Sequence, residues 1–435
     1  MIWAKEEMMP RAEIEAIQLE RLKKQVEIAY NKVKPYRVKM EEAKLRPEDI
    51  KSLKDVSKLP FVTKEDFRAN YPFGLFAVDR SDIRRLHASS GTTGKPTVVG
   101  YTENDMKSWT ETVSRIAVMG GASSKDTAQI CFGYGMFTGA LGLHYGLENM
   151  GIDIIPSSVG NTKKQIMFMQ DFGTTILVAT PSYALHIAEV IKQEGFVPAK
   201  DFKLRIGLLG GEALSDKMRY ELNELWEGSV LFTQNYGMSE LNGPGISGEC
   251  EEIAGMHINE DHFLAEIIDP NTLEVLPEGS EGELVITCLT KETIPLLRYR
   301  TRDITSLNYE KCRCGRTTVR MEPLKGRSDD MLLIRGVNVF PSQIEEVLLS
   351  IDEIGSNYEI EVNRDKHMDN MLVRVELTDY DLLDSFSLLE QLEKRIKFGI
   401  REIVGIDATI KILAPRSLKR FEGKAKRVLD LRDKN

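Results

Sequence analysis

The sequence predicts an α/β protein with a large N-terminal domain and a small α+β C-terminal domain. Strand-like apolar runs alternate with helical patterns between residues 152 and 237, an antiparallel texture follows, and a second strand–helix series ends the chain. The 435 residues exceed what one hydrophobic core usually serves. We therefore expect an N-terminal domain over residues 1–325, a β subdomain over 246–325 within it, and a C-terminal domain over 326–435.

Amphipathic and capping patterns mark two helices near the N-terminus. Apolar residues recur at helical spacing between Arg11 and Lys34, with charged residues between them. Farther along, Thr63 is a candidate N-cap, and Asp66 follows three residues later in a pattern close to a capping box. We expect a long helix over residues 11–34 and a short helix that begins after Thr63.

The central part of the chain alternates strands and helices. Its strand-like runs cover residues 152–156, 174–181, 204–212 and 229–237, and helical patterns cover 182–195 and 215–226. This alternation is typical of a parallel sheet, in which ligands bind at the carboxyl ends of the strands. The stretches "GGE" (residues 210–212) and "NYGMSE" (residues 235–240) fall at two such ends.

Later strands show a different pattern of apolar and polar residues. Residues 263–270 and 282–289 alternate apolar and polar side chains, as half-buried antiparallel strands do, and "LPEGSEG" between them predicts a turn. The C-terminal segment, residues 326–435, then begins with a strand. A helix over 341–351, a strand over 372–377, a helix over 388–400 and a strand over 408–413 follow it.

Composition limits the classes of function. Lys plus Arg number 58 and Asp plus Glu number 67, and this net charge of -9 argues against a general nucleic-acid-binding protein. The first residues lack a secretory signal pattern, and charged residues interrupt the most apolar stretch, Ile130 to Pro156. Five cysteines indicate a reducing compartment. We expect a cytoplasmic protein that binds neither membranes nor nucleic acid, and the sequence leaves a homodimer open.

The stretch "SSGTTGKP" predicts a phosphate-binding loop. It does not match the Walker A pattern, because two residues instead of four separate the glycines and a proline follows the lysine. Glycines nevertheless let backbone N–H groups approach a phosphate, and hydroxyls and a lysine supply donors and charge. A surface turn is the alternative. The candidate residues are Ser89, Ser90, Gly91, Thr92, Thr93, Gly94 and Lys95.

Four more motifs follow this loop in order: "NYGMSE", "RYRTRD", "GRSDDMLLIRGVNVFPSQIEE" and "EGKAKRV". Together, between residues 89 and 428, the five motifs resemble those of the adenylate-forming superfamily of acyl-CoA synthetases. Their wording is most similar to that of the phenylacetate–coenzyme A ligase family. Each motif alone is a weak signal, but five in order over nearly the whole chain are a strong one.

The resemblance implies a ligase that uses ATP, Mg²⁺ and coenzyme A. Phenylacetate or a close aryl acid would form an acyl adenylate and pyrophosphate, and the coenzyme A thiol would then displace AMP. Alternatives are a different acid or acceptor: indoleacetate, a carrier-protein thiol or a deazaflavin cofactor. A catalytically silent nucleotide- or aryl-acid-binding module is the non-enzyme alternative, and the retained Lys424, Glu240 and Asp303 speak against it.

The resemblance also assigns a nucleotide site. The phosphate loop would hold the leaving pyrophosphate, where charge develops. Glu240 would be the magnesium ligand, Tyr236 would stack on adenine, and Asp303 would accept hydrogen bonds from both ribose hydroxyls. Besides the loop, the expected nucleotide-binding residues are Gly211, Glu212, Tyr236, Gly237, Met238, Ser239, Asp303 and Arg327.

Two half-reactions in one site imply a mobile C-terminal domain. In the resembling family a hinge falls at Asp329, and a hinge needs few residues that absorb backbone rotation. Lys424 would act between the acid and the α-phosphate in one pose; Lys419 and Lys426 match that position less well. In the other pose Arg335 and Gly336 would border the coenzyme A passage.

An acid pocket is predicted from aromatic and small residues. Aromatic walls with small floor residues suit a flat aryl ring, although ordinary helix–sheet packing gives the same pattern. The candidates are Tyr134, Phe137, Gly139, Ala140, Ala179 and Pro181.

The sequence also predicts a metal site, whose residues do not belong to the catalytic set of the resembling family. Cys312 and Cys314 lie in "CRCG", and Cys250 and His257 lie about sixty residues earlier. Three cysteines and one histidine can form a tetrahedral zinc site, and a small β subdomain would benefit from one. Reduced thiols without a metal are the alternative, and His262 is a candidate substitute ligand.

Overall fold

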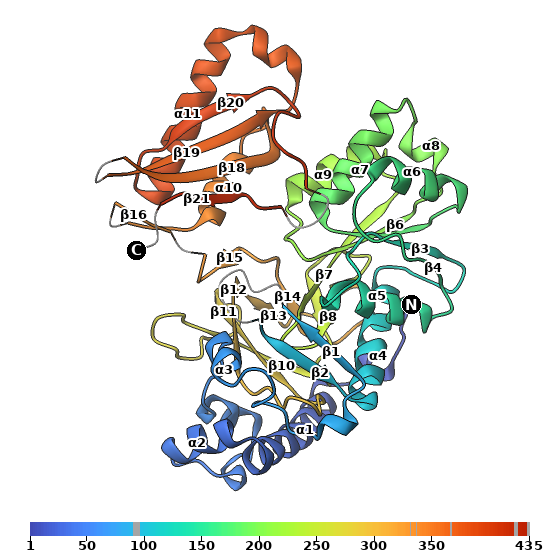
Figure 1. The fold of residues 1–435 in the computed structure, drawn as a ribbon, viewed down its shortest axis with the longest axis vertical. Coiled ribbons are helices and arrows are strands. Elements are labelled where there is room, and N and C mark those ends of the chain that lie inside the picture. The colour runs from blue at the N-terminus through green and yellow to red at the C-terminus, as the bar shows by residue number, and fades with distance from the viewer. Residues whose placement is uncertain (90–95, 331, 336, 366–367, 422–424, 433–435) are drawn as a thin grey trace.

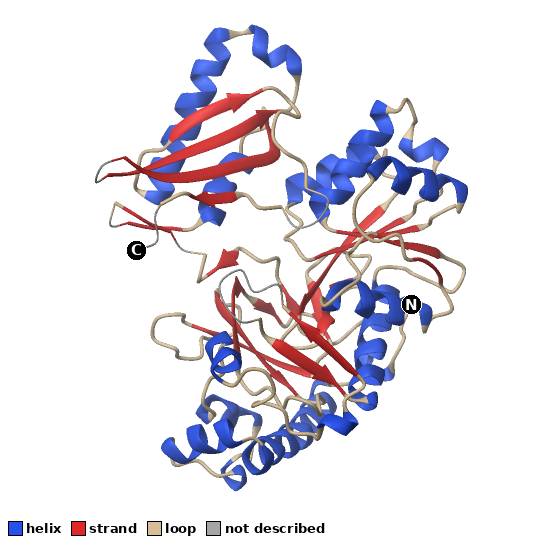
Figure 2. Ribbon diagram, viewed as in Figure 1, coloured by secondary structure: helices blue, strands red, loops and turns tan. Residues whose placement is uncertain are grey.

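The computed structural model describes residues 1–89, 96–330, 332–335, 337–365, 368–421 and 425–432. The predicted site residues 90–95, 336 and 424 therefore lie outside the described residues. Figures 1 and 2 show a large N-terminal part and a smaller C-terminal part, each built from sheets and helices. The described apolar residues form three core clusters, and the third draws only on the C-terminal part. The predicted α/β class with a large N-terminal and a small C-terminal domain is confirmed.

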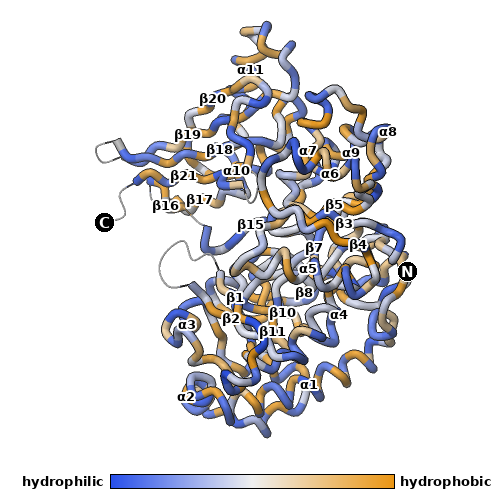
Figure 3. Tube along the Cα trace, turned by 45° about the vertical axis from the view of Figure 1, so that its right-hand side comes forward, coloured by the Kyte–Doolittle hydropathy of each residue, from blue (hydrophilic) through white to orange (hydrophobic). Residues whose placement is uncertain are grey.

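Helices at the N-terminus follow the sequence pattern closely. The long helix α1 (Arg11–Lys32) is followed by α2 (Lys34–Glu42). Figure 3 shows hydrophilic and hydrophobic stretches alternating along α1, as expected for a helix with one buried face. The short α3 (Lys64–Ala69) begins after Thr63, whose backbone N–H donates to Asp66 at 2.8 Å. Short 3₁₀ turns in this region cover Lys5–Met8, Pro47–Asp49, Leu53–Lys58 and Arg80–Asp82. A fifth 3₁₀ turn, Tyr380–Asp384, lies in the C-terminal part.

A nine-stranded sheet is the centre of the N-terminal domain, with the order β13-β14-β9-β8-β7-β6-β5-β3-β4. Its parallel run comprises β7 (Leu231–Met238), β6 (Ile206–Gly210), β5 (Ile176–Ala179), β3 (Thr127–Ile130) and β4 (Asp153–Ile155). The predicted parallel sheet is thus present. The helices of this region are α4 (Glu103–Met119), α5 (Thr138–Glu148), α6 (Thr162–Asp171), α7 (Pro181–Gln193), α8 (Pro198–Asp201) and α9 (Asp216–Leu225).

Strands after residue 242 divide between two sheets. The antiparallel strands β8 (Gly243–Glu249), β9 (Met256–Ile258), β14 (Arg320–Met321) and β13 (Leu307–Asn308) extend the nine-stranded sheet. A separate four-stranded sheet contains β10 (Phe263–Ile268), β11 (Gly282–Cys288), β12 (Tyr299–Thr305) and β15 (Gly326–Arg327). The region predicted as one β subdomain therefore contributes to both sheets, because β8 folds back along β7. A hairpin of β1 (Arg85–Ala88) and β2 (Val98–Tyr101) flanks the predicted phosphate loop.

The C-terminal part is a four-stranded sheet with two helices. The sheet order is β20-β19-β18-β21, formed by β20 (Thr409–Leu413), β19 (Met368–Leu377), β18 (Ile354–Asp365) and β21 (Val428–Asp430). The helices are α10 (Pro341–Leu349) and α11 (Phe386–Val404), and a small hairpin pairs β16 (Leu332–Ile334) with β17 (Val337–Val339). No helix among the described residues is both long and apolar enough to cross a membrane.

Candidate active site

The carboxyl ends of β6 and β7 bring two motifs side by side. The strands pair in parallel, with Gly210 opposite Asn235, so "GGE" and "YGMSE" leave the sheet at neighbouring positions. Gly211 has a φ of +79°, a backbone conformation that residues with a Cβ atom rarely adopt. At Gly237 a Cβ atom would lie 2.1 Å from the Gly243 carbonyl oxygen, so only glycine fits against the returning strand. Backbone geometry thus explains why these turns are glycine-rich.

Glu240 is linked to the base of the predicted phosphate loop through a threonine. The Thr97 hydroxyl lies 3.1 Å from Glu240 Oε1 and 2.7 Å from the Ser89 hydroxyl. Ser89 and Thr97 also join their backbones, because the Ser89 N–H donates to the Thr97 carbonyl at 3.0 Å. Glu240 is 5% exposed, and within the described residues no lysine or arginine forms a salt bridge with it. Such a buried carboxylate is suited to a cationic ligand.

Asp303 lies at the centre of a second polar group. The Tyr236 hydroxyl donates to Asp303 Oδ2 at 2.6 Å, and the Arg327 guanidinium donates to Oδ1 at 3.0 Å. Pairing of β12 with β15 sets this contact, since Asp303 lies opposite Arg327. Burial raises the pKa of Asp303 to about 6, although Arg327 and the Tyr236 hydroxyl lower it. The carboxylate therefore changes charge close to neutral pH.

Arg327 also contacts the residue predicted as the hinge. Its Nε and Nη2 donate to the Asp329 carboxylate at 2.9 and 3.1 Å, and Asp329 is exposed. The segment after Asp329 leads into the C-terminal domain, where Arg335 donates to the Asp369 carbonyl at 2.7 Å. Roles for Asp329 as a hinge and for Arg335 in binding coenzyme A remain predictions.

Glu212 lies between the two domains. Its carboxylate accepts a hydrogen bond from the Ser182 hydroxyl at 2.7 Å and another from the Ala425 backbone N–H. Ser239, at the end of the β7 motif, lies with its hydroxyl 3.0 Å from that of Thr138. Met238 packs against the first core cluster. These contacts place the predicted nucleotide residues around one region but test none of their roles.

The residues predicted for the acid pocket lie after β3, at the end of β5 and at the start of α5 and α7. These strands are parallel neighbours, so the loops after them begin side by side. The Tyr134 hydroxyl lies 3.0 Å from His144 Nδ1, and Phe137 is 49% exposed. Ala140 and Ala179 are buried in separate core clusters. Gly139 lies in α5 and Pro181 begins α7. Assignment of these six residues to an acid pocket stays a prediction.

The predicted cysteine–histidine set comes together. Ligand atoms of Cys250, His257, Cys312 and Cys314 lie within 4.8 Å of one another, at the end of β8, on β9 and in the loop before β14. His257 Nδ1 lies 3.0 Å from the Thr318 hydroxyl, which leaves Nε2 directed toward Cys314 at 3.4 Å. Burial raises the pKa of Cys250 to about 12. We call this group the cysteine cluster.

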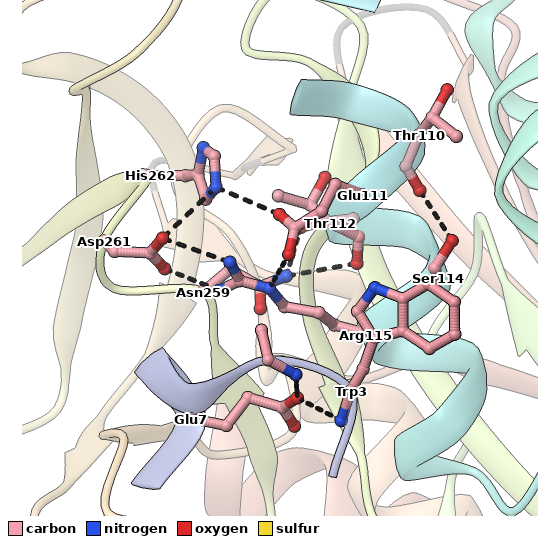
Figure 4. A network of polar contacts seen from close by, with 12 residues as sticks. Trp3, Glu7, Thr110, Glu111, Thr112, Ser114, Arg115, Asn259, Asp261 and His262 are labelled. Atoms are coloured by element: carbon pink, nitrogen blue, oxygen red, sulfur yellow. Dashed lines mark hydrogen bonds and ion pairs between the residues drawn. The ribbon is translucent and has the colours of Figure 1, made fainter. Parts of the chain in front are cut away.

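His262 does not belong to the cysteine cluster, so the alternative ligand is wrong. Its Nε2 lies 3.2 Å from Glu111 and 3.3 Å from Asp261, and its Nδ1 lies 2.8 Å from the Thr290 hydroxyl. Figure 4 shows His262 directed at this network, in which Arg115 makes a bidentate pair with Asp261. The physical reason is that His262 follows β9 after a turn, outside the pairing with β14 that carries His257.

Sequence reasoning missed two residues next to the motifs. Thr97 gave no signal beyond its position after the loop, and its bridging role depends on a contact across 143 residues. Lys291 is also unexpected, because a lysine in a loop usually lies in solvent. Its ammonium is buried, donates to the Leu241 carbonyl at 2.6 Å and lies 4.7 Å from the Tyr101 ring centroid. Burial lowers the pKa of Lys291.

Comparisons with known proteins agree with this geometry. The AMP-binding enzyme family matches residues 11–288, and the AMP-binding enzyme C-terminal domain matches residues 336–432. The phenylacetate-coenzyme A ligase of Thermus thermophilus is 46% identical over 440 residues, covering 98% of each chain. That of Escherichia coli is 44% identical over 422 residues, covering 97% of this chain and 95% of its own.

Solved structures give the same picture. A 2-hydroxyisobutyryl-CoA ligase in the postadenylation state, in complex with 2-HIB-AMP, matches with a TM-score of 0.88 at 28% identity, covering 98% of this chain and 91% of its own. The same ligase in the thioesterification state, with 2-HIB-AMP and CoA, gives 0.72 and covers 99% and 92%. From the full-length relatives and the two matching domains, the chain belongs to the phenylacetate–coenzyme A ligase family of AMP-binding enzymes.

Proposed function

We propose that this chain is an acid–thiol ligase that activates phenylacetate, or a close aryl acid, with ATP and transfers the acyl group to coenzyme A. The observation that carries the proposal is the 44–46% identity to curated phenylacetate-coenzyme A ligases over nearly the full length of each chain. The described polar groups around Glu240 and Asp303 support it, because each offers chemistry that the nucleotide needs.

Two buried carboxylates divide the work of binding ATP. Asp303, oriented by Tyr236 and Arg327, accepts hydrogen bonds from the ribose hydroxyls. Glu240, oriented by Thr97, fits the Mg²⁺ that accompanies ATP, because it is a hard oxygen ligand whose carboxylate forms no salt bridge among the described residues. The buried Lys291 ammonium lies 3.5 Å from the Glu240 backbone carbonyl rather than on its carboxylate. The metal ion would neutralise charge on the phosphates. The contacts of Thr97, Tyr236 and Arg327 orient both carboxylates.

The chemistry then takes place between the substrates. The acid carboxylate attacks the α-phosphorus, pyrophosphate leaves, and the coenzyme A thiol later attacks the acyl carbonyl so that AMP leaves. Lys424 offsets the negative charge of the two anions in the first step. Arg335 and Gly336 border the coenzyme A passage in the second. We infer that the domains change pose between the steps around Asp329.

Pyrophosphate release across a panel of acids tests the proposal. Phenylacetate should release pyrophosphate with MgATP alone, and a thioester should form only when coenzyme A is added. Indoleacetate, benzoate and aliphatic acids of similar length complete the panel. AMP-linked acid that persists with coenzyme A present would favour a different acceptor, and no pyrophosphate with any acid would refute the ligase proposal.

We further propose that the cysteine cluster holds one structural zinc ion. A tetrahedral site with Zn–S bonds of about 2.3 Å and a Zn–N bond of about 2.0 Å requires S···S distances of about 3.8 Å and N···S distances of about 3.5 Å. The observed distances are 3.8 Å between the sulfurs of Cys250 and Cys312 and 3.4 Å between His257 Nε2 and Cys314 Sγ. Thr318 holds the histidine ring in the orientation that such a site uses.

Metal analysis tests the zinc proposal directly. Protein purified without chelator should retain about one zinc per chain after dialysis, and Cys312→Ser should lose it. Cys131→Ser is the matched control, because Cys131 is buried on the other side of the sheet's parallel run, in the second core cluster. Chelation of wild-type protein should lower the melting temperature. Metal-free wild-type protein, or equal metal loss in both variants, would refute the site.

A further inference from the structure

The two domains meet at helix α9 through charged side chains that are partly buried. Lys217 Nζ donates to the Ile351 carbonyl at 2.8 Å and also to the Ile354 carbonyl. One turn later, Glu221 accepts from the Ser356 N–H at 3.1 Å and from its hydroxyl at 2.6 Å. Spacing of four residues puts both side chains on the same face of α9. We call Lys217 and Glu221 the α9 clamp.

The charges of the α9 clamp complement the groups that they contact beyond the end of α10. Helix α10 ends at Leu349, so the Ile351 carbonyl lies just beyond its negatively polarised end, where a lysine is favourable. Glu221 meets a donor pair at the start of β18, and Ser356 is only 1% exposed. Lys217 contacts acceptors and Glu221 contacts donors, so the two sets of contacts form together only when residues 351–356 face α9.

Burial makes these contacts costly to form without their partners. Desolvation lowers the pKa of Lys217 and raises that of Glu221, although hydrogen bonds from Ser356 and the charge of Lys217 lower the latter. Each group therefore depends on the other domain for hydrogen bonds that replace water. A third charged contact also joins the two domains. Arg420 of the C-terminal domain pairs with Glu376 of the same domain and lies 3.5 Å from Glu189 on α7 of the N-terminal domain.

The orientation held by the clamp matches one state of a related ligase better than another. The TM-score is 0.88 against that ligase in its postadenylation state and 0.72 in its thioesterification state, at the same 28% identity. A rotation of the C-terminal domain would separate Ile351 and Ser356 from α9. The clamp contacts therefore belong to one pose of the two that the proposed reaction needs.

We propose that Lys217 and Glu221 are positioning residues that select the adenylation pose of the C-terminal domain. The inference rests on the proposed two-step function and adds its pose control. We assign neither side chain a contact with substrate; both act by holding residues 351–356 of the C-terminal domain. Their loss should slow the first half-reaction and leave the second intact, because the second takes place after the contacts have broken.

Half-reaction kinetics test the clamp. The double variant Lys217→Met/Glu221→Gln should lower pyrophosphate release about tenfold, equivalent to about 1.4 kcal/mol in pose population. Thioester formation from supplied acyl adenylate should stay within about twofold of wild type. Glu224→Gln is the matched control, because Glu224 is exposed on the same helix. The single variant Lys217→Arg keeps the charge, so it should retain most of the wild-type rate of pyrophosphate release. Equal loss in both half-reactions, or no loss in either, would overturn the proposal.

Amide hydrogen exchange supplies a readout that does not depend on activity. The Ser356 N–H donates to Glu221, so exchange in the peptide 350–358 should accelerate in Glu221→Gln/Lys217→Met and stay unchanged in Glu224→Gln. Failure of wild-type protein to release pyrophosphate would refute the ligase proposal, whereas unchanged exchange in the double variant would refute the clamp. A melting temperature close to that of wild type establishes that the double variant is folded.

Discussion

Replacement of Thr97 by valine isolates a single hydroxyl behind the proposed magnesium ligand. Valine keeps the β-branched shape at a fully buried position and replaces only the hydroxyl by a methyl group. That oxygen lies 3.1 Å from Glu240 Oε1 and 2.7 Å from Ser89 Oγ. The backbone bond from the Ser89 N–H to the Thr97 carbonyl persists, so the hairpin that carries the phosphate loop should keep its register.

The expected magnitude follows from the charge and burial of Glu240. A hydrogen bond to a charged group contributes roughly 1.5–3 kcal/mol. Glu240 is 5% exposed, so water does not readily replace the lost donor. Since about 1.4 kcal/mol corresponds to a tenfold change, kcat/KM for MgATP should fall roughly 10- to 100-fold. Thioester formation from supplied acyl adenylate should change much less, because pyrophosphate has already left.

The assay measures initial rates of pyrophosphate release at several MgATP and free Mg²⁺ concentrations. Thr97→Ser retains the hydroxyl and should keep at least a third of the wild-type rate, which separates the hydrogen bond from a packing effect. Higher Mg²⁺ should partly restore Thr97→Val if Glu240 is misoriented. A Thr97→Val enzyme with kcat/KM for MgATP within twofold of wild type would refute the positioning role.

Other outcomes follow from the same contacts. The KM for ATP should rise about tenfold as the pH falls from 8 to 5, because Asp303 with a pKa of about 6 becomes protonated and loses acceptor capacity; a flat profile would contradict this. Tyr236→Phe removes a donor to that carboxylate, so the midpoint of the profile should move to higher pH. Lys424→Ala should nearly abolish adenylation yet spare thioester formation from supplied adenylate; equal loss would count against two poses. Arg298→Met leaves Glu266 buried and unpaired and should cost about 3–5 kcal/mol of unfolding free energy in urea, since the pair is bidentate at 3.0 Å.

Local sequence patterns were sufficient to predict the helices and strands, but not to predict which strands pair with one another. The helix after Thr63 needed only the cap and Asp66, which lie three residues apart. The parallel strands needed only apolar runs separated by helices. By contrast, no local pattern distinguishes β8, which continues the nine-stranded sheet, from β10, which belongs to another. Sheet membership depends on contacts between distant segments, so the single β subdomain was an incomplete description.

The choice between two histidines shows the same limit. His257 and His262 are five residues apart, and the sequence names His257 as the ligand with His262 as its substitute. Strand register decides between them, because β9 places His257 opposite Arg320 on β14, close to the loop that carries Cys314. His262 instead completes an ion-pair network with Glu111 on α4. Thr97 was missed for a related reason, since its partner Glu240 lies far away in the chain.

Strand β8 connects the proposed active site to the cysteine cluster. Its residue Ser247 lies opposite Tyr236 on β7, and the strand ends one residue before Cys250. On the far side of the cluster, Arg316 forms a buried ion pair with Glu7 at 2.6 Å, so the same loop also holds the N-terminal segment. A metal ion there would fix the end of β8 that lies next to Tyr236. Loss of the metal should therefore loosen the N-terminal segment and the end of β8 before it affects the nucleotide residues on β7, whose parallel partner β6 holds them from the opposite side.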